Sequence, residues 1–180
     1  MALSRKRAAG LTAALTVSVC LLAAVPALGA NQRLVRVQDD CDPVTFNAQD
    51  PPIPCVGDGR TTFDELINEF LATGAAKRWH FSRPEFNIDA GGTITATNIG
   101  GEFHSFTEVP RFGNGCVPPL NTGDDPPVVD CSILATTGLE PGDSLQVTVS
   151  TPGTHLFQCM IHPWMRSTVD VRARGNRGED

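Results

Sequence analysis

Short segments in which apolar and polar residues alternate, separated by Gly- and Pro-containing turns, constrain the fold of this 180-residue chain most strongly. The segments with this pattern are 79–81, 85–88, 93–97, 103–109, 144–150, 155–159 and 167–172. An alternation of period two places one set of side chains in a core and the other in water, as in half-buried strands. We expect Ile94, Ala96, Val169 and Val171 to face inward. Many short strands with a single helix predict an all-β fold, a β-sandwich.

One segment predicts a helix instead. Thr62 and Glu65 fit a capping box at its start, and Gly74 ends it. Its apolar residues follow a helical stripe: Phe63, Leu66, Ile67, Phe70 and Leu71. We expect this stripe to be buried against the main domain; docking of a partner protein on it is the alternative. The residues before the helix, 31–60, are rich in Pro and Asp and are predicted to form an irregular arm.

The first thirty residues resemble a targeting segment. A basic start at residues 5–7 precedes an apolar run at 8–25, and small residues at 26–30 offer a cleavage site after Gly29 or Ala30. An uncleaved membrane anchor is the alternative, because the run is nearly long enough to span a bilayer. A signal peptide predicts an extracytoplasmic protein, either secreted, periplasmic or attached to the cell envelope, with no membrane span after cleavage. The predicted organisation is a signal peptide (1–30), an arm and helix (31–75), a β-domain (76–173) and a flexible tail (174–180).

The charge of the chain is acidic. The full sequence has a net charge of −6, and residues 31–180 carry −9, from 11 basic and 20 acidic residues. This balance argues against nucleic acid as a partner. It suits either an encounter with a basic protein surface or simple solubility.

The cysteines indicate an oxidising compartment and one leftover thiol. Export favours disulfide formation, and five cysteines follow residue 30, so at least one stays unpaired within the chain. Proximity in the sequence favours Cys41–Cys55 and Cys116–Cys131, although other pairings remain open. The first of these would staple the arm. The cysteine left over is Cys159.

Cys159 begins the spacing Cys-x2-His-x2-Met with His162 and Met165. Two imidazoles and a thiolate with a weak axial methionine form the electron-transfer site of blue copper proteins, so one histidine is missing from this set. Of the other histidines, His104 is the best candidate, because it begins a strand after a Gly-rich turn and would lie near one end of a sandwich. His80 and His155 are predicted to be ordinary strand residues.

At these residues the sequence resembles the cupredoxins, the small type 1 blue copper proteins. The matching parts are the segment Gly-Gly-Glu-Phe-His-Ser-Phe around His104 and, 55 residues later, the Cys159 loop, which is short and similar to that of amicyanins. The resemblance covers roughly residues 79–173 and implies a cupredoxin-like Greek-key β-sandwich. It implies one copper ion with His104, Cys159 and His162 as equatorial ligands and Met165 as the axial one. Cupredoxins usually place Asn after the first histidine to tie the two ligand loops together, whereas this chain has Ser105.

The ligand set predicts a one-electron carrier rather than an enzyme, because four protein ligands leave no position for a substrate. The alternative is a copper-binding protein for storage, delivery or sensing. A multicopper enzyme would need further copper centres, for which the chain has only two spare histidines. The partner would be a redox protein, with a basic surface if the charge of this chain steers it. It would dock on an apolar patch around an exposed His162 edge, formed by Met160, Ile161, Pro163 and Trp164.

Overall fold

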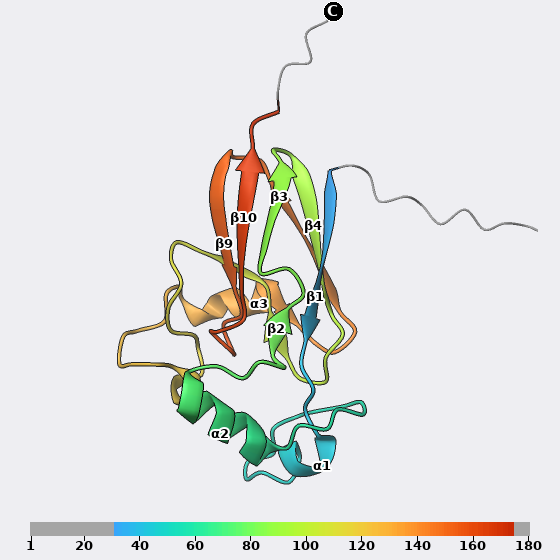
Figure 1. The fold of residues 1–180 in the computed structure, drawn as a ribbon, viewed down its shortest axis with the longest axis vertical. Coiled ribbons are helices and arrows are strands. Elements are labelled where there is room, and N and C mark those ends of the chain that lie inside the picture. The colour runs from blue at the N-terminus through green and yellow to red at the C-terminus, as the bar shows by residue number, and fades with distance from the viewer. Residues whose placement is uncertain (1–30, 175–180) are drawn as a thin grey trace, which may run out of the picture.

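Two four-stranded sheets pack face to face in the computed structural model, which describes residues 31–174 (Figure 1). The first sheet has the strand order β2-β1-β4-β8 and the second β3-β10-β9-β6, while β5 and β7 form a small separate ladder. This two-sheet sandwich confirms the predicted fold class. The strands are β1 (Gln32–Gln38), β2 (His80–Phe81), β3 (Glu85–Asp89), β4 (Gly92–Asn98), β5 (His104–Ser105), β6 (Thr107–Val109), β7 (Gly138–Leu139), β8 (Ser144–Val149), β9 (Gly153–Gln158) and β10 (Arg166–Arg172).

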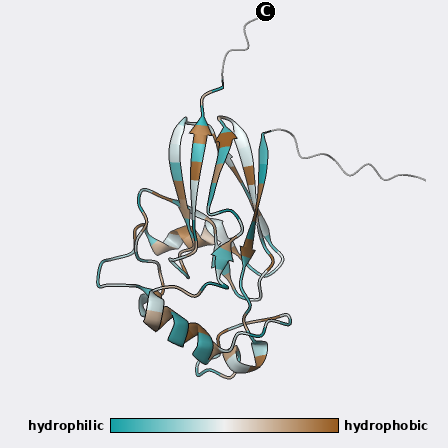
Figure 2. Ribbon diagram, viewed as in Figure 1, coloured by the Kyte–Doolittle hydropathy of each residue, from teal (hydrophilic) through white to brown (hydrophobic). Residues whose placement is uncertain are grey.

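The core lies between the inward faces of the two sheets, and the period-two pattern identified it correctly. Ile94 and Ala96 of β4 are fully buried, as are Val169 and Val171 of β10. Figure 2 shows the resulting alternation of hydrophilic and hydrophobic residues along the strands. The residues expected to point inward therefore do so.

Strand β1 corrects the prediction of an irregular segment over residues 31–60. Gln32–Gln38 pairs in parallel with β4, with Val35 opposite Ala96, and both Val35 and Val37 are fully buried. In the sequence this strand shows only one short alternation, Val35-Arg36-Val37, with Gln32-Arg33 before it and Gln38 after it. The N-terminal segment is thus part of the sandwich before it becomes an arm.

The predicted strand over 103–109 is split into two. His104–Ser105 pairs with β7, whereas Thr107–Val109 pairs with β9 at the edge of the second sheet. Phe106, between the two pieces, is buried and stacks on Phe157 with ring centroids 4.5 Å apart. The break lets His104 leave the plane of the second sheet and lie at the end of the sandwich.

Helix α2 (Phe63–Thr73) begins and ends where the sequence predicts. Thr62 and Glu65 form both hydrogen bonds of the capping box, and Gly74 ends the helix with a positive φ of 75°. Leu66 and Phe70 are buried, so the stripe does pack against the rest of the domain, but Leu71 is 74% exposed. Figure 1 shows α2 across the end of the sandwich opposite the C-terminus.

Further short helical turns occur beyond the one helix that we predicted. They are α1 (Pro43–Phe46), α3 (Leu134–Thr137) and the 3-10 turns Pro118–Leu120 and Cys131–Ile133. Each has three or four residues, too few to produce a helical stripe that the sequence could reveal.

Two disulfides join the pairs favoured by sequence proximity. Cys41 is bonded to Cys55 and Cys116 to Cys131, and Cys159 is the free cysteine among residues 31–174. The first bridge closes the arm after β1, and the second ties the long loop between β6 and β7.

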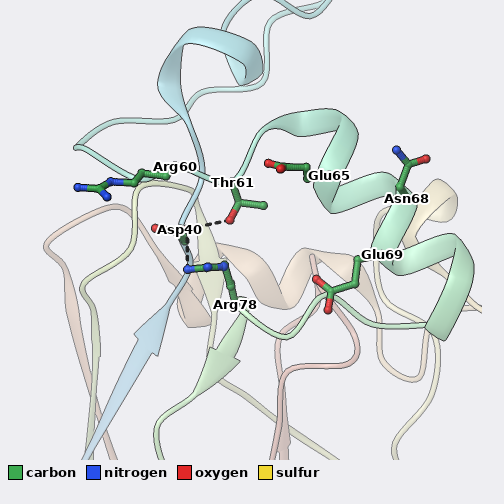
Figure 3. A pocket seen from close by; sticks show the side chains of 7 residues that line it. All are labelled: Asp40, Arg60, Thr61, Glu65, Asn68, Glu69 and Arg78. Carbon is green, nitrogen blue, oxygen red and sulfur yellow. Dashed lines mark hydrogen bonds and ion pairs between the residues drawn. The ribbon is translucent and has the colours of Figure 1, made fainter.

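The arm is also fixed to the sandwich by polar contacts of Asp40, directly after β1. Thr61 Oγ1 donates to the Asp40 carboxylate at 2.7 Å, and Arg78 pairs with the same oxygen at 3.0 Å. Figure 3 shows these contacts on the wall of a hollow that α2 flanks. They hold the start of α2 against the ends of β1 and β2.

Within residues 31–174, no helix is long and apolar enough to cross a membrane. The predicted signal peptide and most of the predicted tail lie outside the residues that the structure describes.

Candidate metal centre

The loop from Cys159 to Met165 connects β9 to β10 at the α2 end of the sandwich. Gln158 and Arg166 are paired across the two strands, so the loop is held at both ends. The Cys159 N–H donates to the Met165 carbonyl at 3.0 Å, and the Met165 N–H donates to the His162 carbonyl at 2.9 Å. These bonds curl the loop inward, and Cys159, His162 and Met165 are all buried.

His104 meets this loop from β5. Its Nδ1 lies 3.7 Å from Cys159 Sγ and 3.2 Å from His162 Nδ1. One donor atom from each of these three residues lies within 4.8 Å of the other two. The structure thus brings together the histidine selected from the sequence and the two donors of the loop.

The electrostatics of the cluster favour a thiolate. Burial alone would raise the pKa of Cys159, but hydrogen bonds and charge from His104 and His162 outweigh it and hold that pKa well below its usual value. Burial likewise disfavours the His104 cation, yet its bonds to Asp39 and Cys159 raise its pKa to about 9. The thiolate and an imidazolium therefore stabilise each other.

Asp39 is a functional residue that the sequence did not reveal. Its Oδ2 accepts the His104 Nε2–H at 2.8 Å, which leaves Nδ1 of His104 facing the cluster. The same carboxylate accepts the backbone N–H groups of Gly101 and Glu102. A Cβ at Gly100 would overlap this carboxylate, so the glycines before His104 allow its approach. Burial raises the pKa of Asp39, but the His104 contact and the backbone donors lower it to about 2.

A second carboxylate backs the other histidine. Glu102 Oε2 lies 3.8 Å from His162 Nε2 and accepts the Trp79 indole N–H at 2.6 Å. Burial raises the pKa of Glu102, although the nearby His162 and the indole donor oppose this effect. Each imidazole therefore presents Nδ1 to the cluster and Nε2 to a buried acidic residue.

Comparisons with known proteins identify similar folds but no close relative. No protein-family model matches the chain, and no curated protein matches it. A purple cupredoxin from Nitrosopumilus maritimus is 16% identical, with a TM-score of 0.41 over 77% of this chain and 98% of that one. The plastocyanin of Dryopteris crassirhizoma is 20% identical, with a TM-score of 0.40 over 77% and 99%. Amicyanin from Paracoccus versutus is 21% identical, with a TM-score of 0.34 over 52% and 73%.

Two facing four-stranded sheets carry a His–Cys–His cluster at one end, with the cysteine loop directly before the last strand. The structure is therefore a two-sheet β-sandwich that places this cluster at one end. The sequence's resemblance to cupredoxins implied such a sandwich, with His104 and the loop of Cys159 at one end.

Ser105 stands where the resemblance to cupredoxins led us to expect Asn, and it links the strand of His104 to the loop of Cys159. Its backbone N–H points to Cys159 Sγ at 3.4 Å, and its hydroxyl accepts the Met160 N–H at 2.8 Å. Thr107 Oγ1 also donates to that hydroxyl, at 3.0 Å. The residue after His104 therefore connects the strand of His104 to the loop of Cys159, although it is not Asn.

The exposed His162 edge that we expected at the centre of the docking patch is not at the surface. His162 is 1% exposed, and Met160 and Pro163 are buried as well, while Ile161 and Trp164 are partly buried. The cause is the N-terminal part of the chain, which covers this end of the sandwich. Trp164 packs on Phe70 of α2 at 5.1 Å between ring centroids and donates its indole N–H to the Ala76 carbonyl at 3.1 Å.

His80 and His155 lie away from the cluster. His155 Nδ1 contacts Glu108 at 2.6 Å, and its Nε2 contacts the Thr151 carbonyl at 2.8 Å. His80 is exposed on β2. Both are strand residues, as predicted.

The donor set fits copper. Two imidazole nitrogens face each other in a buried space beside a thiol whose pKa is held well below its usual value, and a buried thioether residue, Met165, follows in the same loop. Thiolate and thioether suit Cu(I), and imidazole suits both oxidation states. The cluster is consistent with a type 1 copper site.

Proposed function

We propose that this chain is an exported type 1 copper protein that carries single electrons. The observation that supports this most directly is the convergence of His104, Cys159 and His162 in a buried cluster at one end of the sandwich. Copper bound there would supply a one-electron couple between Cu(I) and Cu(II).

The contribution of the protein is to hold its donors in one place. Backbone bonds fix the loop of Cys159, Ser105 ties it to the strand of His104, and Asp39 fixes the ring of His104. Donors held in this way move little when the charge of the centre changes, so little reorganisation opposes electron transfer. With Met165 as the fourth ligand, no position remains for a substrate, which supports a carrier rather than an enzyme.

We also propose that the protein acts outside the cytoplasm with a redox protein as its partner. The predicted signal peptide supports export, and the two disulfides suit an oxidising compartment. Detecting the protein in extracytoplasmic fractions, with residues 1–30 absent, would test this part of the proposal.

The function itself is tested by adding Cu(II) to the purified protein lacking residues 1–30. We expect one copper per chain, an intense blue colour, a type 1 EPR signal and reversible cycling of one electron. Copper that binds without cycling, or that passes readily to an acceptor apoprotein, would instead favour storage or delivery. Failure to bind copper through Cys159 would refute both functions.

A further inference from the structure

The burial of His162 raises the question of where an electron enters this protein. The ring of His162 is enclosed by Trp79, Trp164 and Glu102, and its side chain is only 2% exposed. A partner protein therefore cannot touch it directly. Because electron tunnelling weakens steeply with distance, the partner has to approach where the path from the His162 ring to the protein surface is shortest.

At that place Trp164 lies between the His162 ring and the surface. Its ring meets the His162 ring edge to face, with centroids 5.4 Å apart, and the residue is partly exposed. Trp164 also lines a surface hollow of about 320 Å³, between the end of α2 and the loop before β7. A single aromatic side chain thus joins the buried histidine to the surface (Figure 1 shows the position of α2 over this end).

The other routes for an electron between His162 and the surface are longer or lack an aromatic ring next to His162. Trp79 is buried and stacks on Phe46, which is also buried, so that path reaches the partly exposed Phe63 only through a third ring. On the other side of His162, Ile161 lines a separate hollow of about 280 Å³. That path lacks an aromatic ring at Ile161, and carboxylates line its hollow.

The charge of the Trp164 hollow differs from that of the chain. Arg166 lines it, and no Asp or Glu does among the residues that the structure describes there. The guanidinium is held in place, because Nε donates to the Pro163 carbonyl at 2.7 Å and the group lies 5.0 Å from the centre of the Phe112 ring. In contrast, among the described residues Glu102 and Glu140 line the Ile161 hollow with no basic residue, and the hollow of Figure 3 combines Asp40, Glu65 and Glu69 with two arginines, Arg60 and Arg78.

We propose that the Trp164 hollow, formed by Thr73, Ala75, Leu120, Pro163, Trp164 and Arg166, is the docking surface for a redox protein with an acidic patch beside its redox group. This inference rests on the proposed electron-carrier function and names the route for it. Electrons pass between the partner and the centre through Trp164 and His162. Arg166 pairs with the acidic patch of the partner.

The net charge of the chain suggested a partner with a basic surface. At the point of contact, however, the charges next to the docking surface determine which partner surface fits. Charges separated by more than about 8 Å are largely screened at physiological ionic strength. The cation beside Trp164 therefore matters more at contact than the acidic residues on remote faces. Distant charges affect the rate of encounter mainly at low salt.

Two small oxidants of opposite charge test the route. The copper-loaded, reduced protein is mixed in a stopped-flow instrument with hexacyanoferrate(III), an anion, or with tris(1,10-phenanthroline)cobalt(III), a cation. We expect Arg166→Gln to slow the anionic oxidant roughly threefold at low salt and to leave the cationic one unslowed. Arg60→Gln, which removes the same charge from the hollow of Figure 3, is the matched control and should change neither rate in this way.

The aromatic step is tested with Trp164→Leu and Trp164→Phe, after the blue spectrum and the potential of each variant are shown to match those of the parent. The Leu variant should react several-fold more slowly with both oxidants, whereas Phe keeps a ring and most of the rate. Equal rates for the Leu variant and the parent would overturn the route through Trp164.

If Trp164→Leu fails to fold or bind copper, Arg166→Gln still decides the docking surface: equal effects of Arg166→Gln and Arg60→Gln would refute it. A parent protein that never turns blue would refute the proposed function itself. That outcome is distinct from a blue, redox-active protein in which these variants behave like the parent.

Discussion

Asp39 and His104, 65 residues apart in the chain, are joined by a 2.8 Å hydrogen bond from Nε2 to Oδ2, and both side chains are at most 1% exposed. Asp39 directly follows β1, and His104 begins the strand that faces Cys159. The bond therefore connects the N-terminal segment to the candidate copper centre. A carboxylate in this position orients a metal-binding imidazole and increases its basicity.

Replacing Asp39 by Asn should raise the reduction potential of the centre. The loss of a negative charge beside His104 destabilises Cu(II) more than Cu(I), and copper affinity should fall by about 10- to 100-fold. Voltammetry and copper titration measure the two effects. Asp40→Asn is the matched control, because Asp40 bonds to Thr61 and Arg78 instead. A potential that shifts equally in both variants would mean that the contact with His104 is not the cause.

Replacing Cys159 by Ala should abolish the blue colour. In the proposed site the thiolate would be the soft donor to copper, and a contact between thiolate and copper is typical of blue sites. Optical and EPR spectra after addition of Cu(II) measure the change. Blue colour that persists in this variant would exclude the assigned ligand set.

Replacing Met165 by Leu should leave copper bound and raise the reduction potential. Leucine fills a similar volume in this buried position but would remove the weak electron donor that we propose for the metal. Copper stoichiometry and voltammetry test both halves of this prediction. An unchanged potential would remove Met165 from the axial role.

Replacing Ser105 by Ala should destabilise the protein by about 1–3 kcal/mol, because the buried Met160 N–H loses its acceptor. Urea denaturation of the metal-free protein measures this change. Ser144→Ala is the control: the Ser144 hydroxyl pairs with Thr97 at the surface, so its loss should cost no more than about 0.5 kcal/mol. Equal effects of the two substitutions would contradict the role of Ser105 between the loops.

The metal-free protein should lose stability in acid partly through Asp39. Its pKa falls from 3.8 to about 2 on folding, so the ionised carboxylate stabilises the fold above pH 3.8 and this contribution disappears as the pH falls toward 2. The full difference corresponds to about 2 kcal/mol. Urea denaturation between about pH 5 and pH 2 should show a smaller loss for Asp39→Asn than for the parent. Parallel curves would exclude this contribution.

The sequence by itself determined the sandwich and the main donors. Ile94, Ala96, Val169 and Val171 reveal the core because a strand alternates its two faces locally, whatever it packs against. The spacing of Cys159, His162 and Met165 could be recognised because all three lie in one loop. His104 was recoverable only because a Gly-rich turn and a strand start placed it near the end of the sandwich.

Only the tertiary structure decided what surrounds those donors. The contacts of Asp39 with His104 and of Glu102 with His162 join residues about 60 positions apart, and no local pattern encodes such pairs. The cover over His162 likewise depends on how α2 and the disulfide-closed arm fold back over the end of the sandwich, where Phe70 meets Trp164. An exposed ligand edge was the natural expectation for the loop alone. Packing of a distant segment, rather than the composition of the loop, buried it.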